Sequence, residues 1–297
     1  MSEPQRLALA VDVGGTKLAA GVVDEHGRLL ERVSAPTVRT DDGAALFSSL
    51  AELVGRLAPY DRFAVCGTGC GGPMTAGGEL VSPLNIGAWR SFPLREELAR
   101  LTGLPTYVDN DAKALALAEG WVGAAVGFRN YLAMVVSTGI GGGIVLDGRL
   151  LEGDTGNAGH VGHMIVAVPG RPLPDHVTGV LEAEASGTAI AAHTGRPAAE
   201  ATTAEIAEAG THVGRAVGSI ANVLDLRLAV VAGSVALGYG EPFFAAAQAE
   251  IDRICRLDHS RGAEIRPAGC GDEGPLIGAA AVGLRHLDVP LGILEAL

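Results

Sequence analysis

The sequence predicts an α/β protein made of two similar halves that face a cleft. Hydrophobic residues make up 48% of the 297 residues and 43 residues are glycine, a composition that suits tightly turned α/β structure. A chain of this length can also build two lobes. In addition, two strand patterns joined by a glycine turn occur near residue 14 and again near residue 139.

The first half is rich in strand patterns. Apolar and alternating runs predict strands at 7–13, 18–24, 28–35 and 63–68 and a helix at 42–58. We expect a first lobe at residues 1–110, completed by a C-terminal helix at 282–297.

The second half repeats the opening pair of strands. Strands at 131–137 and 143–146 flank the second glycine turn, after a helical run from residue 111 to Val122. The later patterns predict a strand at 228–232 and helices at 178–193, 203–224, 242–256 and 275–287. We expect the second lobe at residues 111–281.

Composition limits the classes of function. The formal net charge of −12 argues against a nucleic-acid or anionic-membrane surface, because both need clustered basic side chains. We therefore expect small-molecule partners, no nucleic acid and no membrane. The first six residues are too few and too polar for a signal peptide, and no apolar run reaches about 18 residues. These features favour a cytoplasmic protein.

The cysteines agree with a reducing compartment. They lack the spacing of a metal site or a disulfide framework, so we expect reduced core thiols, with a redox pair of the first two as the alternative. The four are Cys66, Cys70, Cys255 and Cys270.

The first glycine turn is the most informative segment. An apolar strand carries one carboxylate, Asp12, into the pair Gly14-Gly15, which is followed by Thr16 and Lys17. An ionised Asp in a buried strand needs a cation or several donors. Backbone N–H groups of the glycines, the hydroxyl and the ammonium suit an anion beside a metal. ATP with Mg²⁺ fits that description.

Two other interpretations of this turn were weighed. A P-loop is excluded, because no glycine stands five residues before Gly15 and Leu18 follows Lys17. A plain hairpin turn with a solvated Asp12 is the alternative. Lysine usage argues against it, since lysine occurs only at positions 17 and 113 and both fall inside motifs.

A second candidate site lies at the pair Asn110-Asp111. A short strand ends there and a helix begins, so a carboxylate in the mouth between the lobes could accept a proton from a substrate hydroxyl. The alternative is an ordinary Asp helix cap.

Further along the chain, a spaced set of glycines and apolar residues resembles the pattern of the ROK family of sugar kinases and sugar-responsive regulators. The matching positions are Val136, Gly139, Ile140, Gly141, Gly143, Ile144, Gly153, Gly159, Gly162 and His163. The segment 12–17 resembles that family's first phosphate turn, Asn110-Asp111 its catalytic pair, Gly233-Ser234 its adenosine-side turn and 276–280 its last helix. The resemblance covers essentially the whole chain.

This resemblance implies an actin-like, hexokinase-type ATPase fold of two lobes with an interdomain cleft. It implies Asp111 as the general base and Asp12 near Mg²⁺, through water. It also implies ATP as the phosphoryl donor and a homodimer. The residues that it places around the nucleotide are Gly14, Gly15, Thr16, Lys17, Thr138, Gly139, Gly233 and Ser234.

For the sugar, the resemblance implies hydrogen bonds from Asn85, Asn110, Asp111, His160, His163 and Glu182. At position 160 the family usually has Glu. An imidazole can donate as well as accept and removes one negative charge, so the sugar groups recognised there can differ. Bacterial N-acetylmannosamine kinases also carry His at this place. The alternative is a neutral replacement in a glucose site.

Two further positions depart from the family. Leu173, Asp175 and Val180 stand where the family's zinc loop has cysteines, so we expect no structural zinc. A makeshift site from His163, Asp175 and His176 is the alternative. Lys113 replaces the usual Asn or Gln; it either faces the cleft, near a phosphate or Asp111, or lies on the helix surface.

The sequence thus predicts an ATP-dependent kinase that phosphorylates a hydroxyl of a hexose such as glucose. The 6-hydroxyl is the expected acceptor. N-acetylmannosamine, an amino sugar or a cyclitol are alternative substrates. A sugar-responsive transcriptional regulator is the alternative of another class, but six residues before the first strand cannot hold a helix-turn-helix domain.

Overall fold

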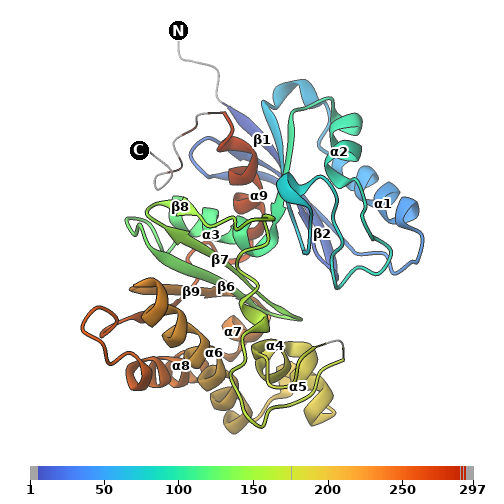
Figure 1. Ribbon diagram of the computed structural model, residues 1–297. Coiled ribbons are helices and arrows are strands. Elements are labelled where there is room, and N and C mark those ends of the chain that lie inside the picture. The colour runs from blue at the N-terminus through green and yellow to red at the C-terminus, as the bar shows by residue number, and fades with distance from the viewer. Residues whose placement is uncertain (1–5, 175, 288, 290, 292–297) are drawn as a thin grey trace. The chain divides into compact units, whose positions relative to one another are not determined.

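The computed structural model describes residues 6–174, 176–287, 289 and 291 (Figure 1). These residues form two compact units. Unit 1 takes the residues up to 126, the segment 152–158 and the residues from 270 onward. Unit 2 takes 127–151 and 159–269. Unit 1 therefore extends beyond residue 110, where the sequence places the end of the first lobe. The division of the chain into two functional lobes stays a prediction.

Unit 1 is a five-stranded sheet in the order β3-β2-β1-β4-β5. Strand β1 pairs antiparallel with β2 and parallel with β4, which pairs parallel with β5. The strands are β1 Leu7–Val13, β2 Lys17–Asp24, β3 Leu29–Pro36, β4 Val65–Cys70 and β5 Thr106–Asn110. The helices of this unit are α1 Gly43–Gly55, α2 Leu94–Thr102, α3 Asp111–Trp121 and α9 Gly274–Leu284.

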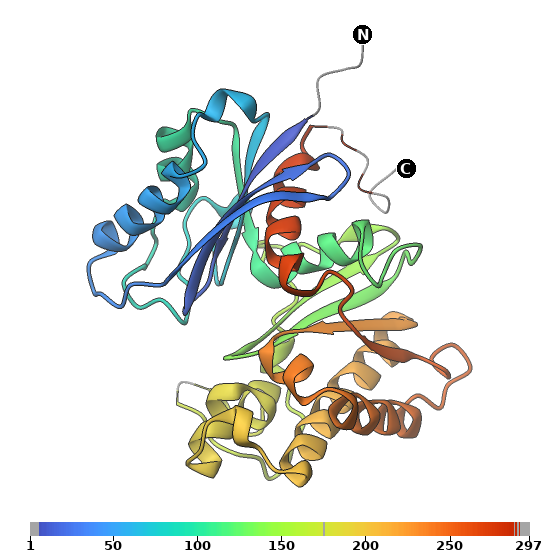
Figure 2. The same ribbon diagram turned by 180° about the vertical axis from the view of Figure 1, so that it is seen from behind.

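The two faces of this sheet differ in side-chain size. Leu9 and Val11 on one face join a core with leucines of α1 and α2. On the other face Ala10 is in register with Gly21 and Gly67, and a Cβ on Gly67 would lie 2.0 Å from the backbone oxygen of Ala279 in α9. Figure 2 shows α9 on the face opposite α1. The small residues are therefore what allows α9 to lie directly on the strands.

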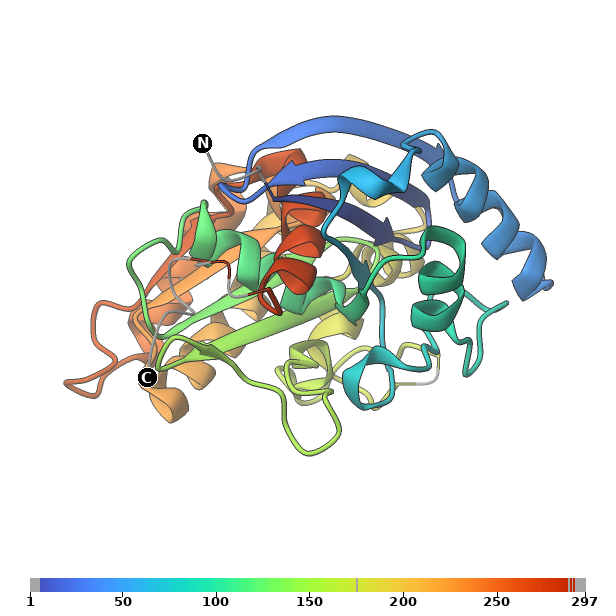
Figure 3. The same ribbon diagram turned by 90° about the horizontal axis from the view of Figure 1, so that it is seen from above.

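Helices α3 and α9 pack against each other just as closely. A Cβ on Gly278 would lie 2.3 Å from the backbone oxygen of Ala114. Figures 2 and 3 show the two helices side by side. Helix α9 thus supports both the first strand and the helix that begins at Asp111.

Unit 2 repeats this plan with a five-stranded sheet in the order β10-β9-β6-β7-β8. As in unit 1, a hairpin (β6 and β7) adds a later strand (β9) parallel to its first strand. The strands are β6 Tyr131–Val136, β7 Ile140–Leu146, β8 Arg149–Leu150, β9 Leu228–Ala232 and β10 Glu264–Pro267. The helices are α4 Leu181–Ala185, α5 Gly187–Thr194, α6 Thr203–Leu224, α7 Ser234–Tyr239 and α8 Glu241–Ile254. The predicted repetition of two α/β halves is confirmed.

Short 3-10 turns complete the description. They lie at Tyr60–Arg62, Ala76–Gly78, Val161–His163, Ala198–Glu200 and Gly271–Glu273. All four cysteines are free thiols, and all but the partly exposed Cys270 are buried. Among the residues that the structure describes, no helix combines the length and the apolar character that crossing a bilayer requires.

Three predictions about elements need correction. The helix predicted at 178–193 is broken into α4 and α5 by Ser186, whose backbone is extended and whose Oγ caps α5 by accepting from the N–H of Ala189. Helices α2 and α7 and strands β8 and β10 were not predicted. The predicted helix at 275–287 ends earlier, at Leu284. Of the helix predicted at 282–297, residues 288, 290 and 292–297 lie outside the described residues.

Candidate active site

The predicted phosphate and base residues of unit 1 lie at the carboxyl ends of three parallel strands. In register, Asp12 of β1 is beside Gly69 of β4, which is beside Asp109 of β5. A Cβ on Gly69 would lie 3.8 Å from Oδ1 of Asp12 and 3.7 Å from the Cα of Asp111. Asp12 and Asp111 thus both lie close to Gly69, together with the Cβ of Ala114 at 3.5 Å from the same point.

The two carboxylates influence each other. Burial, followed by the negative charge of Asp111, raises the pKa of Asp12 from 3.8 to about 7, against the lowering effect of Lys17 and Arg32. Without a cation, Asp12 therefore holds a proton over much of the neutral range. A divalent cation would relieve this cost, since oxygen ligands and negative charge are what Mg²⁺ prefers.

Asn85 closes the same end of the sheet. A Cβ on Gly15 would lie 2.9 Å from its Nδ2, and a Cβ on Gly71 would lie 3.3 Å from its Oδ1. Both glycines follow strand ends, those of β1 and β4. The amide of Asn85 therefore lies over the first glycine turn, and Asn85, predicted from the resemblance alone, belongs to the group around Asp12.

The first glycine turn itself is a β-hairpin. The N–H of Gly14 donates to the oxygen of Lys17 at 3.0 Å, and Thr37 donates its hydroxyl to the oxygen of Gly14 at 2.7 Å. The hairpin interpretation is therefore correct for the shape of the turn. It is wrong for Asp12, which is desolvated rather than solvated. Lys17 is the first residue of β2 and is exposed.

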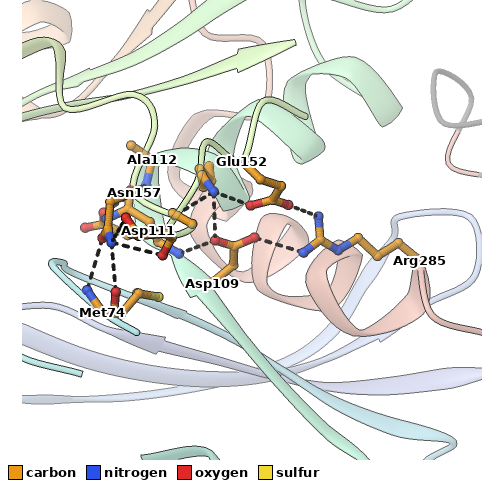
Figure 4. Close-up of polar contacts among 11 residues, drawn as sticks. Met74, Asp109, Asp111, Ala112, Glu152, Asn157 and Arg285 are labelled. Carbon is orange, nitrogen blue, oxygen red and sulfur yellow. Dashed lines mark hydrogen bonds and ion pairs between the residues drawn. The ribbon is translucent and has the colours of Figure 1, made fainter. Parts of the chain in front are cut away.

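The pair Asn110-Asp111 forms the start of α3 (Figure 4). Oδ1 of Asn110 accepts from the N–H of Ala112 at 3.0 Å, and Oδ1 of Asp111 accepts from the same group at 2.8 Å. The N-cap is therefore Asn110 and not an Asp, so the Asp-cap alternative is wrong. Asp111 is the first residue of the helix, where the positive end of the helix dipole favours the ionised carboxylate.

Lys113 occupies neither of its two predicted places. It is fully buried, with no exposed surface, and its Nζ forms an ion pair with Glu152 and donates to the oxygen of Gly156 at 2.8 Å. The side chain therefore points neither to a phosphate nor to solvent.

Unit 2 gathers the predicted nucleotide residues around a second turn. The hydroxyls of Ser137 and Ser234 are 2.9 Å apart, and Thr188 donates its hydroxyl to the oxygen of Thr138 at 2.9 Å. Gly233 has a φ of +102°, and a Cβ there would lie 2.3 Å from the oxygen of Val136. Thr138, Gly139, Gly233 and Ser234 are thus neighbours, at the N-terminal ends of α5 and α7.

Glu182 connects this turn to the histidines. Its Oε2 accepts from the N–H of Ile140 at 2.6 Å, and its Oε1 is 2.9 Å from Nε2 of His176. The ring of His176 stacks on His163 with centroids 5.0 Å apart, and His163 is 6.2 Å from His160. Burial, followed by the charge of His176, lowers the pKa of His163, so its ring is neutral near neutral pH.

The structure adds residues that the sequence did not single out. His176 was named only as a possible zinc ligand, yet it is the partner of Glu182. Glu152, Asp109 and Arg285 surround Lys113 and were not predicted at all. The sequence gives only a weak signal for them, because the single unusual residue in that part of the chain is Lys113, which replaces the family's usual Asn or Gln.

The loop that replaces the family's zinc site is partly apolar. Leu173 and Val180 form a small buried cluster with Ala183 and Ala189. Within the described part of the chain, no group of three or more His, Cys, Asp or Glu side chains is placed to hold a metal ion. Asp175, the third member of the makeshift site, lies outside the described residues, so the expectation that zinc is absent stays a prediction.

Comparison with known proteins fits this geometry. The model of the ROK family matches residues 8–285. A glucokinase of Halalkalibacterium halodurans is 38% identical over 193 residues, which are 63% of this chain and 58% of that protein. An N-acetylmannosamine kinase of Yersinia pseudotuberculosis is 37% identical over 255 residues, 78% of this chain and 84% of that protein.

A solved structure extends the match. The ROK family glucokinase of Streptomyces griseus, in complex with glucose and AMPPNP, superposes with a TM-score of 0.81 at 26% identity. The match covers 94% of this chain and 99% of the other. The fold, the two glycine turns and the match over nearly the whole sequence lead to one conclusion: the chain belongs to the ROK family.

Proposed function

We propose that this protein is an ATP-dependent kinase that transfers the γ-phosphoryl group of ATP to a hydroxyl of a hexose such as glucose. The 6-hydroxyl is the proposed acceptor. The observation that carries the proposal is that Asp12 and Asp111 both lie close to Gly69, at the ends of parallel strands, and that the charge of Asp111 acts on Asp12. Phosphoryl transfer needs little covalent help, so a cation site and a base beside each other suffice for its core chemistry.

Asp111 is the proposed general base. Its place at the start of α3 puts the carboxylate where the helix dipole favours the ionised form. An ionised carboxylate there can accept the proton of the sugar hydroxyl as that oxygen attacks phosphorus in line. Asn110, which caps the same helix, is proposed to bind the sugar beside it.

Asp12 is the proposed residue next to Mg²⁺, which would come with ATP and neutralise the phosphate charge. Asp12 fits this role, because its carboxylate holds a proton near neutral pH for lack of a cation. A bound cation would stabilise the ionised form. Gly14, Gly15, Thr16 and Lys17 are proposed to bind the phosphates from unit 1. From unit 2 we propose Thr138 and Gly139 for the phosphates and Gly233 and Ser234 for the adenosine side.

The sugar is proposed to be bound by Asn85, Asn110 and Asp111 of unit 1 and by His160, His163 and Glu182 of unit 2. Support comes from the contacts that fix two of these side chains. Asn85 packs on the glycine turn, and Glu182 is held by hydrogen bonds with Ile140 and His176. A neutral His163 can both donate to and accept from sugar hydroxyls.

N-acetylmannosamine is the second candidate substrate. Two observations favour it: His160 stands where glucokinases of the family have Glu, and an N-acetylmannosamine kinase is among the relatives of the chain. An imidazole N–H can donate to an acetamido carbonyl, which a carboxylate cannot do.

The test is a panel of sugars with ATP-dependent ADP release as the readout. We expect turnover on glucose or N-acetylmannosamine and loss of about 10²–10⁴-fold in kcat for Asp111→Asn, with sugar binding retained. Asp42→Asn is the matched control, because Asp42 also begins a helix and Asn caps equally well. No ADP release with any sugar, or an Asp111→Asn enzyme within a few-fold of wild type, would overturn the proposal.

We further propose a cytoplasmic homodimer. Reduced thiols support the compartment, and Cys66, whose pKa is raised to about 12 by burial, is a poor nucleophile for disulfide formation. Light scattering on the purified protein tests the dimer, and a monomer across micromolar concentrations would contradict it.

A further inference from the structure

Lys113 is one of only two lysines in the chain and it is completely buried. A buried ammonium is costly unless its partners compensate for the lost water. Here the partners are Glu152, the oxygen of Gly156 and, at 3.7 Å, Oδ1 of Asp109. Two of the three belong to the segment 152–158, and Figure 4 shows Glu152 of this segment close to Asp109 and Arg285.

The segment 152–158 is unusual in its place along the chain. It belongs to unit 1, whereas the residues on both sides of it belong to unit 2. None of its residues is buried, so apolar packing does not hold it. A cavity of about 240 Å³ lies against it, lined by Gly153, Asp154 and Gly156 on one side and by residues 74–78 on another.

Polar contacts therefore fix the segment to unit 1. Besides Lys113, Arg285 reaches Oε1 of Glu152 at 3.4 Å and Oδ2 of Asp109 at 2.9 Å. Near the other end, Asn157 accepts from the N–H of Met74 at 3.1 Å and donates to the oxygen of Met74 at 2.9 Å. Through Glu152 and Gly156, Lys113 ties the segment directly to the helix that begins at Asp111.

We propose that Lys113 is a positioning residue for sugar binding: by holding Glu152 and Gly156 on α3, it fixes the point from which the chain enters the element with His160 and His163. The two histidines follow the segment within five residues. This inference rests on the proposed role of those histidines. A held segment reduces the conformational entropy that is lost when the sugar binds, so its effect is on sugar affinity.

The test uses Lys113→Met, which keeps the length of the buried side chain but removes its donors. We expect the KM for the sugar to rise about 10-fold, in keeping with the loss of hydrogen bonds from a charged group, while the KM for ATP changes less than about two-fold. Lys113→Gln keeps one donor group, so its KM for the sugar should lie between those of the wild type and of Lys113→Met. Glu119→Gln is the matched control, because Glu119 is a buried charge on the same helix that binds Ala124 and Cys270 instead.

Hydrogen exchange gives a readout that does not depend on turnover. In Lys113→Met the amide of Ala158, which donates to the oxygen of Glu152, should exchange faster, whereas amides of β1 and β4 keep the wild-type rate. In Glu119→Gln the amide of Ala158 should remain protected.

The two readouts separate the possible failures. If Ala158 keeps its protection and the sugar KM stays within two-fold in Lys113→Met, the positioning role is wrong and the kinase proposal stands. If Ala158 loses protection while the sugar KM does not change, the segment is held by Lys113 but does not serve sugar binding, and the inference is also overturned. If the wild type phosphorylates no sugar, sugar affinity measured by calorimetry replaces KM: an unchanged affinity in Lys113→Met overturns the inference, and a loss of about 10-fold supports it.

Discussion

Replacing Asp12 by Asn should make the ligand-free protein more stable, although it removes a proposed active-site residue. The raised pKa means that the folded protein holds the proton on Asp12 more tightly than the unfolded chain does. The contribution of this group to stability is then complete below pH 3.8 and is lost as the pH rises toward about 7.

The size of the effect follows from the shift. Each unit between the unfolded pKa and the pH is worth about 1.4 kcal/mol, up to the folded pKa. Folding therefore costs on the order of 1.5 kcal/mol at pH 5, where Asp12 must take up a proton, and on the order of 4 kcal/mol at pH 8, where Asp12 is ionised in the fold. Asn carries no charge and avoids this cost. The stability advantage of Asp12→Asn should thus be about 2–3 kcal/mol larger at pH 8 than at pH 5.

Calorimetric melting without Mg²⁺ or ATP measures this difference. We expect Tm of Asp12→Asn minus Tm of wild type to increase by roughly 5 °C between pH 5 and pH 8. The matched control is Asp24→Asn at the end of the same hairpin. Burial raises the pKa of Asp24, but hydrogen bonds from Arg28 and His26 outweigh it and lower the pKa overall, so this variant should lose stability at pH 8.

A pH dependence of Tm that is the same in wild type and Asp12→Asn would refute the reasoning. It would mean that the carboxylate of Asp12 is solvated or already paired. A second check is calorimetry of ATP binding with Mg²⁺ at pH 6.5 in buffers of different ionisation heat, where the wild type should release roughly 0.7 proton more than Asp12→Asn.

Three more outcomes are expected. His160→Glu should shift the ratio of kcat/KM toward glucose and away from N-acetylmannosamine; an unchanged ratio would mark His160 as a neutral replacement. Activity should survive removal of zinc but not of magnesium, and elemental analysis showing about one tightly held zinc per chain would contradict this. Hydrogen bonds from Arg253 and Arg215 outweigh burial and lower the pKa of Glu250 to about 2, so Glu250→Gln should lower Tm at pH 7 by a few degrees, with the difference disappearing as the pH falls from 4.5 toward 2.

The sequence predicted those parts of the fold whose signals are local. The hairpin with Asp12, the helix 203–224 and the strand 228–232 have apolar patterns of the observed period and turn residues at their ends. Asn110 and Asp111 were found because a cap has a recognisable sequence. Their closeness to Asp12 follows from parallel pairing through β4.

The rest depends on contacts between distant residues. Ser186 interrupts a continuous helical pattern. Only the hydrogen bond that its buried hydroxyl accepts from the N–H of Ala189 shows that it caps a new helix. Helix α2 is short and rich in charge, so its pattern is weak. The partners of Lys113 in the segment 152–158 are 39 and 43 residues away along the chain, and no periodicity reports such a contact. His176 reaches Glu182 only because the loop between them folds back.

The docking of α9 onto β1 and β4 has a consequence for synthesis of the protein. The strands of unit 1 are made first, but the helix that covers their small-residue face is made only after residues 127–269. On the ribosome, the row of Ala10, Gly21 and Gly67 is therefore uncovered while unit 2 emerges. Because domains fold as units when their segments are available, unit 2 can complete its core before the unit that precedes it in sequence. The order of folding then runs against the order of translation, and a chaperone that binds nascent chains would find its target in the first strands.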